Sequence, residues 1–202
     1  MTFRPVGRVT RHFRRAKGIT RRYFITNGFD GALTMLGLMV GFYASGNVVL
    51  PVAISACLGG AVALFMSGLS SAYLSEIAER KRDLRELEQA MITDLKESEH
   101  GQSSRFVPIL VALVNGLSPL LISLIIITPL WLQVAGVMLP VSPIILAISI
   151  ALITIFLLGV FLGRVSKTFW LWSGLRALAI AIVTMMIILF FGGEFSNHVP
   201  QL

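Results

Sequence analysis

The fold is decided by residues 106–163, which read FVPILVALVNGLSPLLISLIIITPLWLQVAGVMLPVSPIILAISIALITIFLLGVFLG. No charged side chain occurs between Arg105 and Arg164. A membrane-spanning helix needs roughly 20 mostly apolar residues, so this segment has room for two spans. Its prolines divide it into two spans. The first covers about residues 106–127 and ends near Pro129, and the second covers about residues 143–163.

The rest of the chain has the same character. The whole chain has 202 residues, of which 55% are hydrophobic and 13% are charged, and its mean hydropathy is +0.83. A soluble domain usually has about a quarter charged residues. Two further uncharged intervals, residues 31–75 and 177–193, have room for two spans and for one span. We therefore predict an all-α polytopic membrane protein with five transmembrane helices, the other three at about residues 27–44, 51–74 and 170–191.

The basic residues are confined to three segments. Of the 17 Lys and Arg residues, eight precede the first span, six lie between spans two and three, and three lie between or just inside spans four and five. The remaining loops, residues 45–49 and 129–142, contain none. The positive-inside rule therefore places the N-terminus in the cytoplasm and the C-terminus outside, in a plasma (inner) membrane. The pI of about 10.3 is therefore explained by basic residues on the cytoplasmic side of the membrane. We expect no nucleic-acid partner.

No Gly or Pro occurs between Ala72 and His100, so span two should continue into the cytoplasm as a helix. Because that helix is longer than an extended return over residues 98–105, we expect it to tilt, or to break near Thr93. The predicted organisation is a basic cytoplasmic arm (1–24), spans one and two (25–75), an acidic cytoplasmic segment (76–105), spans three to five (106–193) and an external tail (194–202).

The basic arm contains no Asp or Glu, and we expect it to contact anionic lipids. A mitochondrial transit peptide is the alternative interpretation. Cys57 is the only cysteine, which excludes an intrachain disulfide and a zinc or iron–sulfur centre built on cysteines.

Asp30 is the first candidate functional residue. It follows the polar residues Thr26 and Asn27 at the cytoplasmic end of span one. Carboxylates within a bilayer are costly and usually mark ion or proton paths. The alternative is an interfacial position, as a helix cap or as the partner of Arg22.

Methionines and a row of acids complete the candidate metal ligands. Met35 and Met66 are the soft ligands within the spans, and a thioether with a carboxylate suits a first-row divalent metal. At 100° per residue, the acids of the cytoplasmic helix fall within an arc of about 80°. They can form a second metal site or a solvated, salt-bridged face. These acids are Glu76, Glu79, Asp83, Glu86, Asp94 and Glu97.

The same residues resemble a known family. Residues 27–34, NGFDGALT, look like the first helix of the vacuolar iron transporter family. Residues 66–76, MSGLSSAYLSE, are similar to the end of its second span, where a methionine and a Tyr-Leu step lead into an acidic helix. Residues 156–177 resemble its last two helices, and the whole resemblance covers about residues 24–193.

The resemblance implies a homodimer of five-span subunits that moves Fe²⁺ or Mn²⁺ out of the cytosol along an interface of first helices, in several members against protons. Asp30 and Met66 would then be metal ligands on the path, and Glu76, Glu79, Asp83 and Glu86 would belong to a shortened metal-collecting segment. Leu58 occupies the place of a family glutamate, which leaves proton exchange open.

An internal similarity points to the same place. Residues 27–31, NGFDG, resemble residues 115–119, NGLSP, and matched helix interruptions often frame a transporter's binding site. Chance is the alternative explanation for two segments this short.

Other functions remain open. The chain could be a non-transporting membrane scaffold or a transporter of a small organic cation or lipid. We predict that it is not an enzyme and needs no cofactor besides the transported metal, because no nucleophile–base pair is apparent. The three histidines, His12, His100 and His198, lie in terminal or loop segments.

Overall fold

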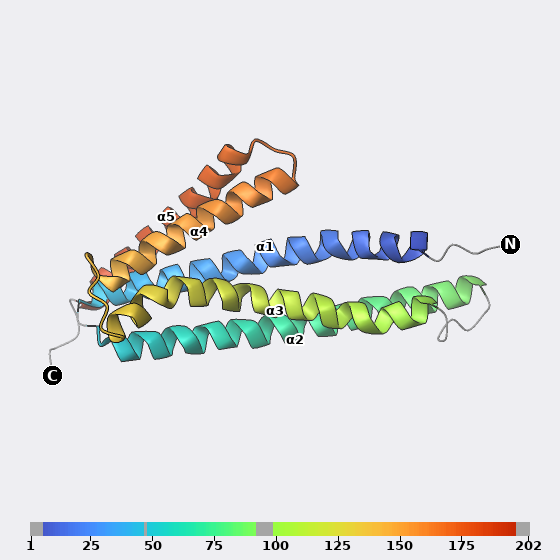
Figure 1. Cartoon of the computed structure of the whole chain (residues 1–202), viewed down its shortest axis with the longest axis horizontal. Coiled ribbons are helices and arrows are strands. Elements are labelled where there is room, and N and C mark those ends of the chain that lie inside the picture. The colour runs from blue at the N-terminus through green and yellow to red at the C-terminus, as the bar shows by residue number, and fades with distance from the viewer. Residues whose placement is uncertain (1–5, 47, 92–98, 197–202) are drawn as a thin grey trace.

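Five helices make up the computed structural model, which describes residues 6–46, 48–91 and 99–196 (Figure 1). No strand occurs in these described ranges, so the fold is all-α. The helices are α1 (Val6–Ser45), α2 (Leu50–Met91), α3 (Glu99–Val134), α4 (Pro143–Val165) and α5 (Trp170–Ser196).

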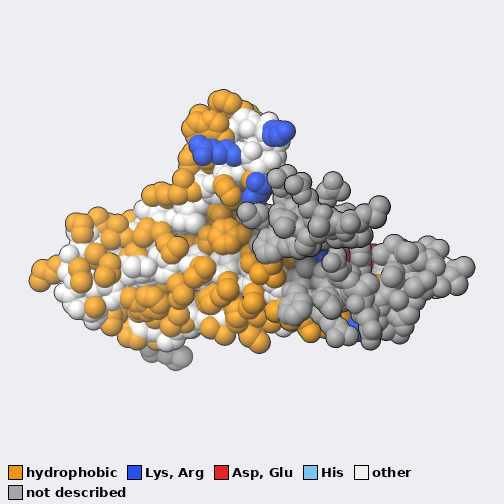
Figure 2. All heavy atoms as spheres, turned by 45° about the vertical axis from the view of Figure 1, so that its right-hand side comes forward, with side chains coloured by type: hydrophobic (Ala, Val, Ile, Leu, Met, Phe, Trp, Pro, Cys, Tyr) orange, Lys and Arg blue, Asp and Glu red, His pale blue; other side chains and the backbone are white. Residues whose placement is uncertain are grey.

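Four of these helices have segments long and apolar enough to cross a membrane. The outward-facing side chains of α4 and α5 are large and apolar, and hydrophobic side chains cover most of the visible body of the molecule (Figure 2). This surface is typical of a multi-pass membrane protein. The four segments are Leu50–Glu86 in α2, Pro108–Val134 in α3, Pro143–Val165 in α4 and Trp170–Gly192 in α5.

Helix α1, whose first half carries the basic arm, is not among these four. It contacts all four other helices. One side of the helix is fully buried and joins α2, α3, α4 and α5 in a single hydrophobic core. Its buried side chains in that core are Ala32, Met35, Leu36, Met39 and Val40.

Helices α2 and α3 lie side by side over most of their length, and together with α1 they extend beyond the α4–α5 hairpin (Figure 1). As expected, α2 continues without a break to Met91. The return toward the third predicted span is itself helical, since α3 begins at Glu99. A helix satisfies the backbone hydrogen bonds of this polar stretch internally. Thr93 and the rest of residues 92–98 lie outside the described residues.

Helix α3 contains three prolines within its length: Pro108, Pro119 and Pro129. The expected end of span three near Pro129 is therefore wrong, because the helix continues to Val134. Each proline removes one intrahelical hydrogen bond. Spanning helices tolerate this where a neighbouring helix packs closely, and Pro119 is fully buried against α1.

Helices α4 and α5 form a hairpin whose backbones touch at small residues. A Cβ on Gly159 would lie 2.6 Å from the Cβ of Ala177, so only glycine fits there. The hairpin diverges from α1 toward its connecting turn (Figure 1). Helix α5 continues to Ser196, so the expected external tail begins as helix, and residues 197–202 lie outside the described residues.

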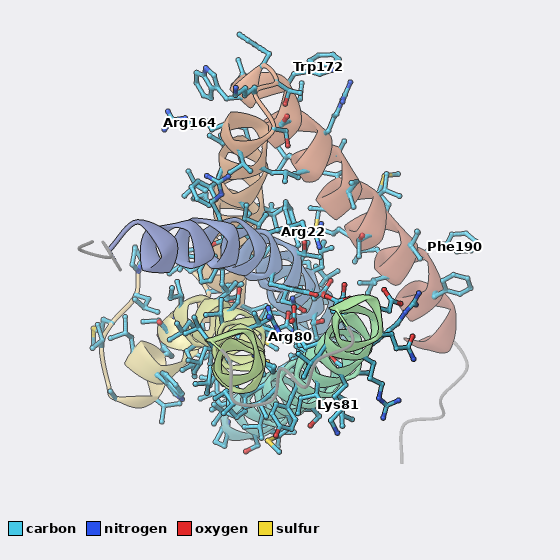
Figure 3. All side chains as sticks on the ribbon, turned by 90° about the vertical axis from the view of Figure 1, so that its right-hand side faces the viewer. Arg22, Arg80, Lys81, Arg164, Trp172 and Phe190 are labelled. Atoms are coloured by element: carbon cyan, nitrogen blue, oxygen red, sulfur yellow. The ribbon has the colours of Figure 1, made fainter. Side chains whose placement is uncertain are left out.

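The charged and uncharged connections lie at opposite ends of the molecule. The α4–α5 turn lies toward the end where α1 begins and where α2 passes into α3 (Figure 1). The view from that end labels Arg22, Arg80, Lys81 and Arg164 on α1, α2 and α4 (Figure 3). The basic arm expected at residues 1–24 continues without interruption into residues 27–44, the expected first span, because α1 is helical from Val6.

Candidate functional site

The side of α1 opposite the core carries small and polar residues. Asp30, Thr34, Gly37 and Gly41 fall within an arc of about 60° on the helix, and we call this set the α1 open face. Asp30 is exposed and the other three are half-buried. The fully buried Met39 lies on the other side of the helix. In the part of the chain that the structure describes, the core therefore leaves this acidic residue uncovered.

A cavity lies beside one end of the α1 open face. It has a volume of about 480 Å³ and is lined by Gly37 and Gly41 of that face and by Val49 and Val52 around the start of α2. A Cβ on Gly41 would meet no atom within 4 Å. The chain thus has open space above Gly41, whereas a Cβ on Gly37 would lie 3.3 Å from Cδ1 of Ile188.

An exposed row of small residues follows Val52 along α2. Its members fall within an arc of about 100°, and a Cβ on Gly59 would meet no atom within 4 Å. Met66 is the largest side chain in the row and is 52% exposed. We call the row the α2 open face; it consists of Ala56, Gly59, Ala63, Met66, Ser67 and Ser70.

Met35, the other predicted thioether ligand, does not lie on either open face. It is fully buried in the hydrophobic core. Its terminal methyl group would be 3.6 Å from a Cβ on Gly60, so it packs between α1 and α2. On the helix it is about 140° away from Asp30. The structure thus places Met35 in the packing between helices, apart from the exposed Asp30 and Met66.

Asn27, the polar residue that precedes Asp30 in the candidate site, belongs to a hydrogen-bonded chain across three helices. Its Nδ2 donates to the carbonyl oxygen of Tyr23, at 3.0 Å, and to Oδ1 of Asn115 on α3. Nδ2 of Asn115 donates in turn to the carbonyl oxygen of Gly68 on α2, at 2.6 Å. Asn115 is only 5% exposed. This asparagine chain therefore links backbone near Asp30 to backbone near Met66.

The two similar segments, residues 27–31 and 115–119, face each other at this crossing. A Cβ on Gly31 would lie 2.7 Å from the Cα of Pro119, so the two helices touch there. Oγ of Ser118 donates to the carbonyl oxygen of Phe24 at 2.5 Å. The internal similarity noted in the sequence is thus a contact between α1 and α3.

The acidic row of α2 is partly neutralised by its own helix. Nε of Arg80 lies 3.1 Å from Oε2 of Glu76, which is buried, and Nε of Arg82 lies 2.8 Å from Oε1 of Glu86. Glu79 and Asp83 are exposed, whereas Asp94 and Glu97 lie outside the described residues. Among the residues that were described, no three His, Cys, Asp or Glu side chains lie close enough to hold one metal ion.

Asp30 and Arg22 do not pair with each other. The guanidinium of Arg22 lies 5.8 Å from the ring centre of Tyr23. The ion pairs found across the described ranges are the two on α2. The expectation that Asp30 is only the partner of Arg22 therefore has no support in the geometry.

Comparison with known proteins identifies a relative from an archaeon. The chain is 32% identical over 173 residues to the uncharacterized protein MJ0645 of Methanocaldococcus jannaschii, and the match covers 82% of this chain and 87% of the archaeal protein. The chain belongs to the MJ0645 family. No family model and no solved structure matches it. Since the match covers 82% of the chain, the MJ0645 family shares most of this helical bundle.

Sequence reasoning missed several polar residues at the centre of this MJ0645-family bundle. The sequence showed Asn115 and Ser118 only as part of a repeated pattern, and Gly68 only as part of the segment 66–76. The Asn-Gly pairs at residues 27–28 and 115–116 were the signal, because an asparagine in a span must find a partner. Ser123 on α3 is also fully buried, and within the described residues its Oγ has no hydrogen-bond partner.

Proposed function

We propose that the protein is a homodimeric transporter that moves a divalent metal ion, Fe²⁺ or Mn²⁺, out of the cytosol. The observation that carries this proposal is the exposure of Asp30 on the α1 open face, on a helix whose other side is fully buried. A carboxylate at such a position is costly against lipid. A path between two copies of α1 would give it water, metal or both.

The proposal adds α1 to the four apolar helices as one more transmembrane span. Residues 27–44 are long enough to cross the apolar layer, and the contacts of α1 with every other helix compensate for its weaker apolar character. The cations then lie on the cytoplasmic side of a plasma (inner) membrane. The N-terminus would be cytoplasmic and the C-terminus would be outside.

Each candidate ligand has a distinct role in this proposal. Asp30 supplies carboxylate oxygen and Met66 supplies thioether sulfur, a donor set suited to a first-row divalent ion. Both are exposed within one chain, on different helices, so a second copy would complete their coordination. Asn27 and Met35 would hold α1 in position beside the path, because Asn27 is hydrogen-bonded to Asn115 and Met35 is buried in the core.

On the cytoplasmic side, Glu79 and Asp83 are the acids best placed to collect metal. Both are exposed, and they lie one turn apart on α2. Glu76 and Glu86 would have to leave their arginine partners before they could bind an ion. Metal collected here would pass to Asp30 and leave at the opposite end, where the open face meets the cavity beside Gly41.

Flux through proteoliposomes tests the proposal. Reconstituted protein should take up Fe²⁺ or Mn²⁺, with Co²⁺ and Zn²⁺ as comparisons. Asp30→Asn should reduce the rate at least tenfold, because it removes the charge and keeps the size of the side chain. Thr128→Ala is the matched control, since its exposed hydroxyl bonds only to its own helix, at the carbonyl of Leu124. Wild-type flux by Asp30→Asn would overturn the proposed path.

A non-transporting membrane scaffold is the second candidate. The pairing of Glu76 and Glu86 with arginines favours it, because a collecting site would leave its acids free. This candidate predicts no flux of any of the four metals. A transporter of a small organic cation or lipid would likewise show no metal flux, and substitution of Glu79 and Asp83 would leave its activity unchanged.

A further inference from the structure

The turn between α4 and α5 concentrates positive charge. We call residues 164–176 the hairpin tip. It carries Arg164, Lys167 and Arg176, all exposed, and no Asp or Glu occurs in the sequence between Arg105 and Glu194. No acidic residue of α4 or α5 between those positions can therefore compensate these three charges.

The two arginines of the hairpin tip both lie against indole rings at the start of α5. Side chains on a helix lean toward its N-terminus, and α5 begins at the tip, so Arg176 reaches back toward the turn. Its guanidinium carbon lies 5.7 Å from the ring centre of Trp172, and that of Arg164 lies 5.9 Å from the ring centre of Trp170. Figure 3 shows Arg164 and Trp172 at the same end of the hairpin.

The backbone of the tip is held in a defined shape. The backbone N–H of Thr168 donates to the carbonyl oxygen of Gly163 at 3.0 Å, and the hydroxyl of Thr168 lies 3.1 Å from that of Ser173. Lys167 has a φ of 54°, a left-handed conformation that glycine adopts without strain. The residue in this left-handed position is a lysine, so it adds a charge to the tip.

The start of α5 adds to the positive potential. The first amides of a helix have no intrahelical acceptor, and the helix dipole places positive charge at the same end. Phosphate groups commonly bind at such helix ends when cations are nearby. At the hairpin tip, two arginines and a lysine accompany this helix end.

We propose that the hairpin tip binds the phosphate of an anionic phospholipid headgroup. The surrounding side chains select a lipid over a free phosphate ion. Phe161, Leu162 and Phe169 are 42%, 40% and 66% exposed, and acyl chains would cover them. Basic and aromatic side chains together are typical of the headgroup level of a membrane. This site is separate from the basic arm and does not depend on metal transport.

Thermal unfolding of the full-length protein in a non-ionic detergent tests the site. Phosphatidylglycerol should raise the unfolding temperature, whereas phosphatidylcholine and inorganic phosphate should not. Each cation near an anionic surface strengthens binding on the order of fivefold. The double variant Lys167→Gln, Arg176→Gln should therefore need roughly 25 times more phosphatidylglycerol for half of the effect.

The matched control is Lys81→Gln, Arg85→Gln, which removes the same charge from exposed positions on α2. It should change the half-saturating lipid concentration by less than about twofold. An equal loss in both double variants would overturn the site in favour of net charge alone, and stabilisation by inorganic phosphate would overturn the lipid assignment. If the double variant does not fold, Lys167→Gly replaces it, since glycine adopts the left-handed backbone without strain. This single variant should weaken lipid binding about fivefold. Unchanged lipid dependence would again refute the site.

Discussion

Replacement of Gly31 by alanine tests the contact between α1 and α3. The new Cβ would lie 2.7 Å from the Cα of Pro119 and 2.8 Å from its carbonyl oxygen, whereas ordinary contacts begin at 3.4 Å. Both atoms belong to backbone, so no side-chain rotation relieves the overlap. The two helices would have to separate by roughly 1 Å, which is a large displacement in a close-packed core.

Separation of the helices has two costs and one compensation. Overpacking of a core costs about 1–3 kcal/mol. The asparagine chain one turn away, from Asn27 to Asn115, would also be stretched, and a hydrogen bond contributes about 0.5–1.5 kcal/mol. Alanine in a helix is more favourable than glycine by about 1 kcal/mol. We expect Gly31→Ala to lower the free energy of unfolding by about 1–3 kcal/mol in total.

Gly60→Ala is the matched control. It also replaces a glycine within a span, but the nearest atoms to its new Cβ are the flexible ends of Leu38 and Met35, both at 3.6 Å. The helix-propensity gain is the same in both variants, so their difference isolates the clash. Unfolding by stepwise addition of SDS to protein in a mild detergent, followed by tryptophan fluorescence, measures both free energies.

Equal stability of the two variants would refute the close approach of α1 to Pro119. A stabilised Gly31→Ala protein would have the same meaning, because only the propensity gain would then remain. Transport provides an independent measurement: Gly31→Ala should also slow metal flux if the proposed path along α1 is correct, while Gly60→Ala should not.

Three further predictions concern the described contacts. Asn115→Ala should lower the free energy of unfolding by about 1–3 kcal/mol, since it removes both the hydrogen bond to the carbonyl of Gly68 and the acceptor of the Asn27 amide; SDS unfolding measures this loss. Glu76→Gln should destabilise the protein by about 1–3 kcal/mol, because its side chain is 9% exposed, whereas Glu86→Gln, at 61% exposed, should cost less than about 0.5 kcal/mol, as thermal unfolding in detergent can check. Cys57 is fully buried, so a maleimide should label it only after the protein unfolds, and rapid labelling of the native protein would contradict its placement.

The helix positions follow from the sequence where long uncharged stretches end at charges or turn residues. Helix α4 begins at Pro143 and α5 begins at Trp170, as expected. The end of α3 could not be predicted, because a proline in a span normally indicates a break. Only the packing of a neighbouring helix, which the sequence does not display, lets the helix pass through Pro119 and Pro129.

The candidate site was predictable in part. The uncharged context of Asp30 indicated an unusual carboxylate, and the structure leaves it exposed beside the glycines of α1. The sequence could not separate the exposed Met66 from the buried Met35, because both are methionines in apolar runs. The i, i+4 spacing of Glu76 and Arg80 is compatible with their pairing, but the sequence could not show that Glu76 is buried.

The central position of α1 has a consequence for biogenesis. Helix α1 is synthesised first, yet most of the surfaces that cover it belong to α3, α4 and α5, which are synthesised later. Alone in lipid, a segment with the carboxylate of Asp30 and an asparagine would partition weakly. With α1 as the proposed additional span, we expect the nascent helix to remain beside the insertion machinery until the later helices are made. A chain that ends after α1, at Ser45, should be extractable by carbonate, whereas the complete chain should stay in the membrane.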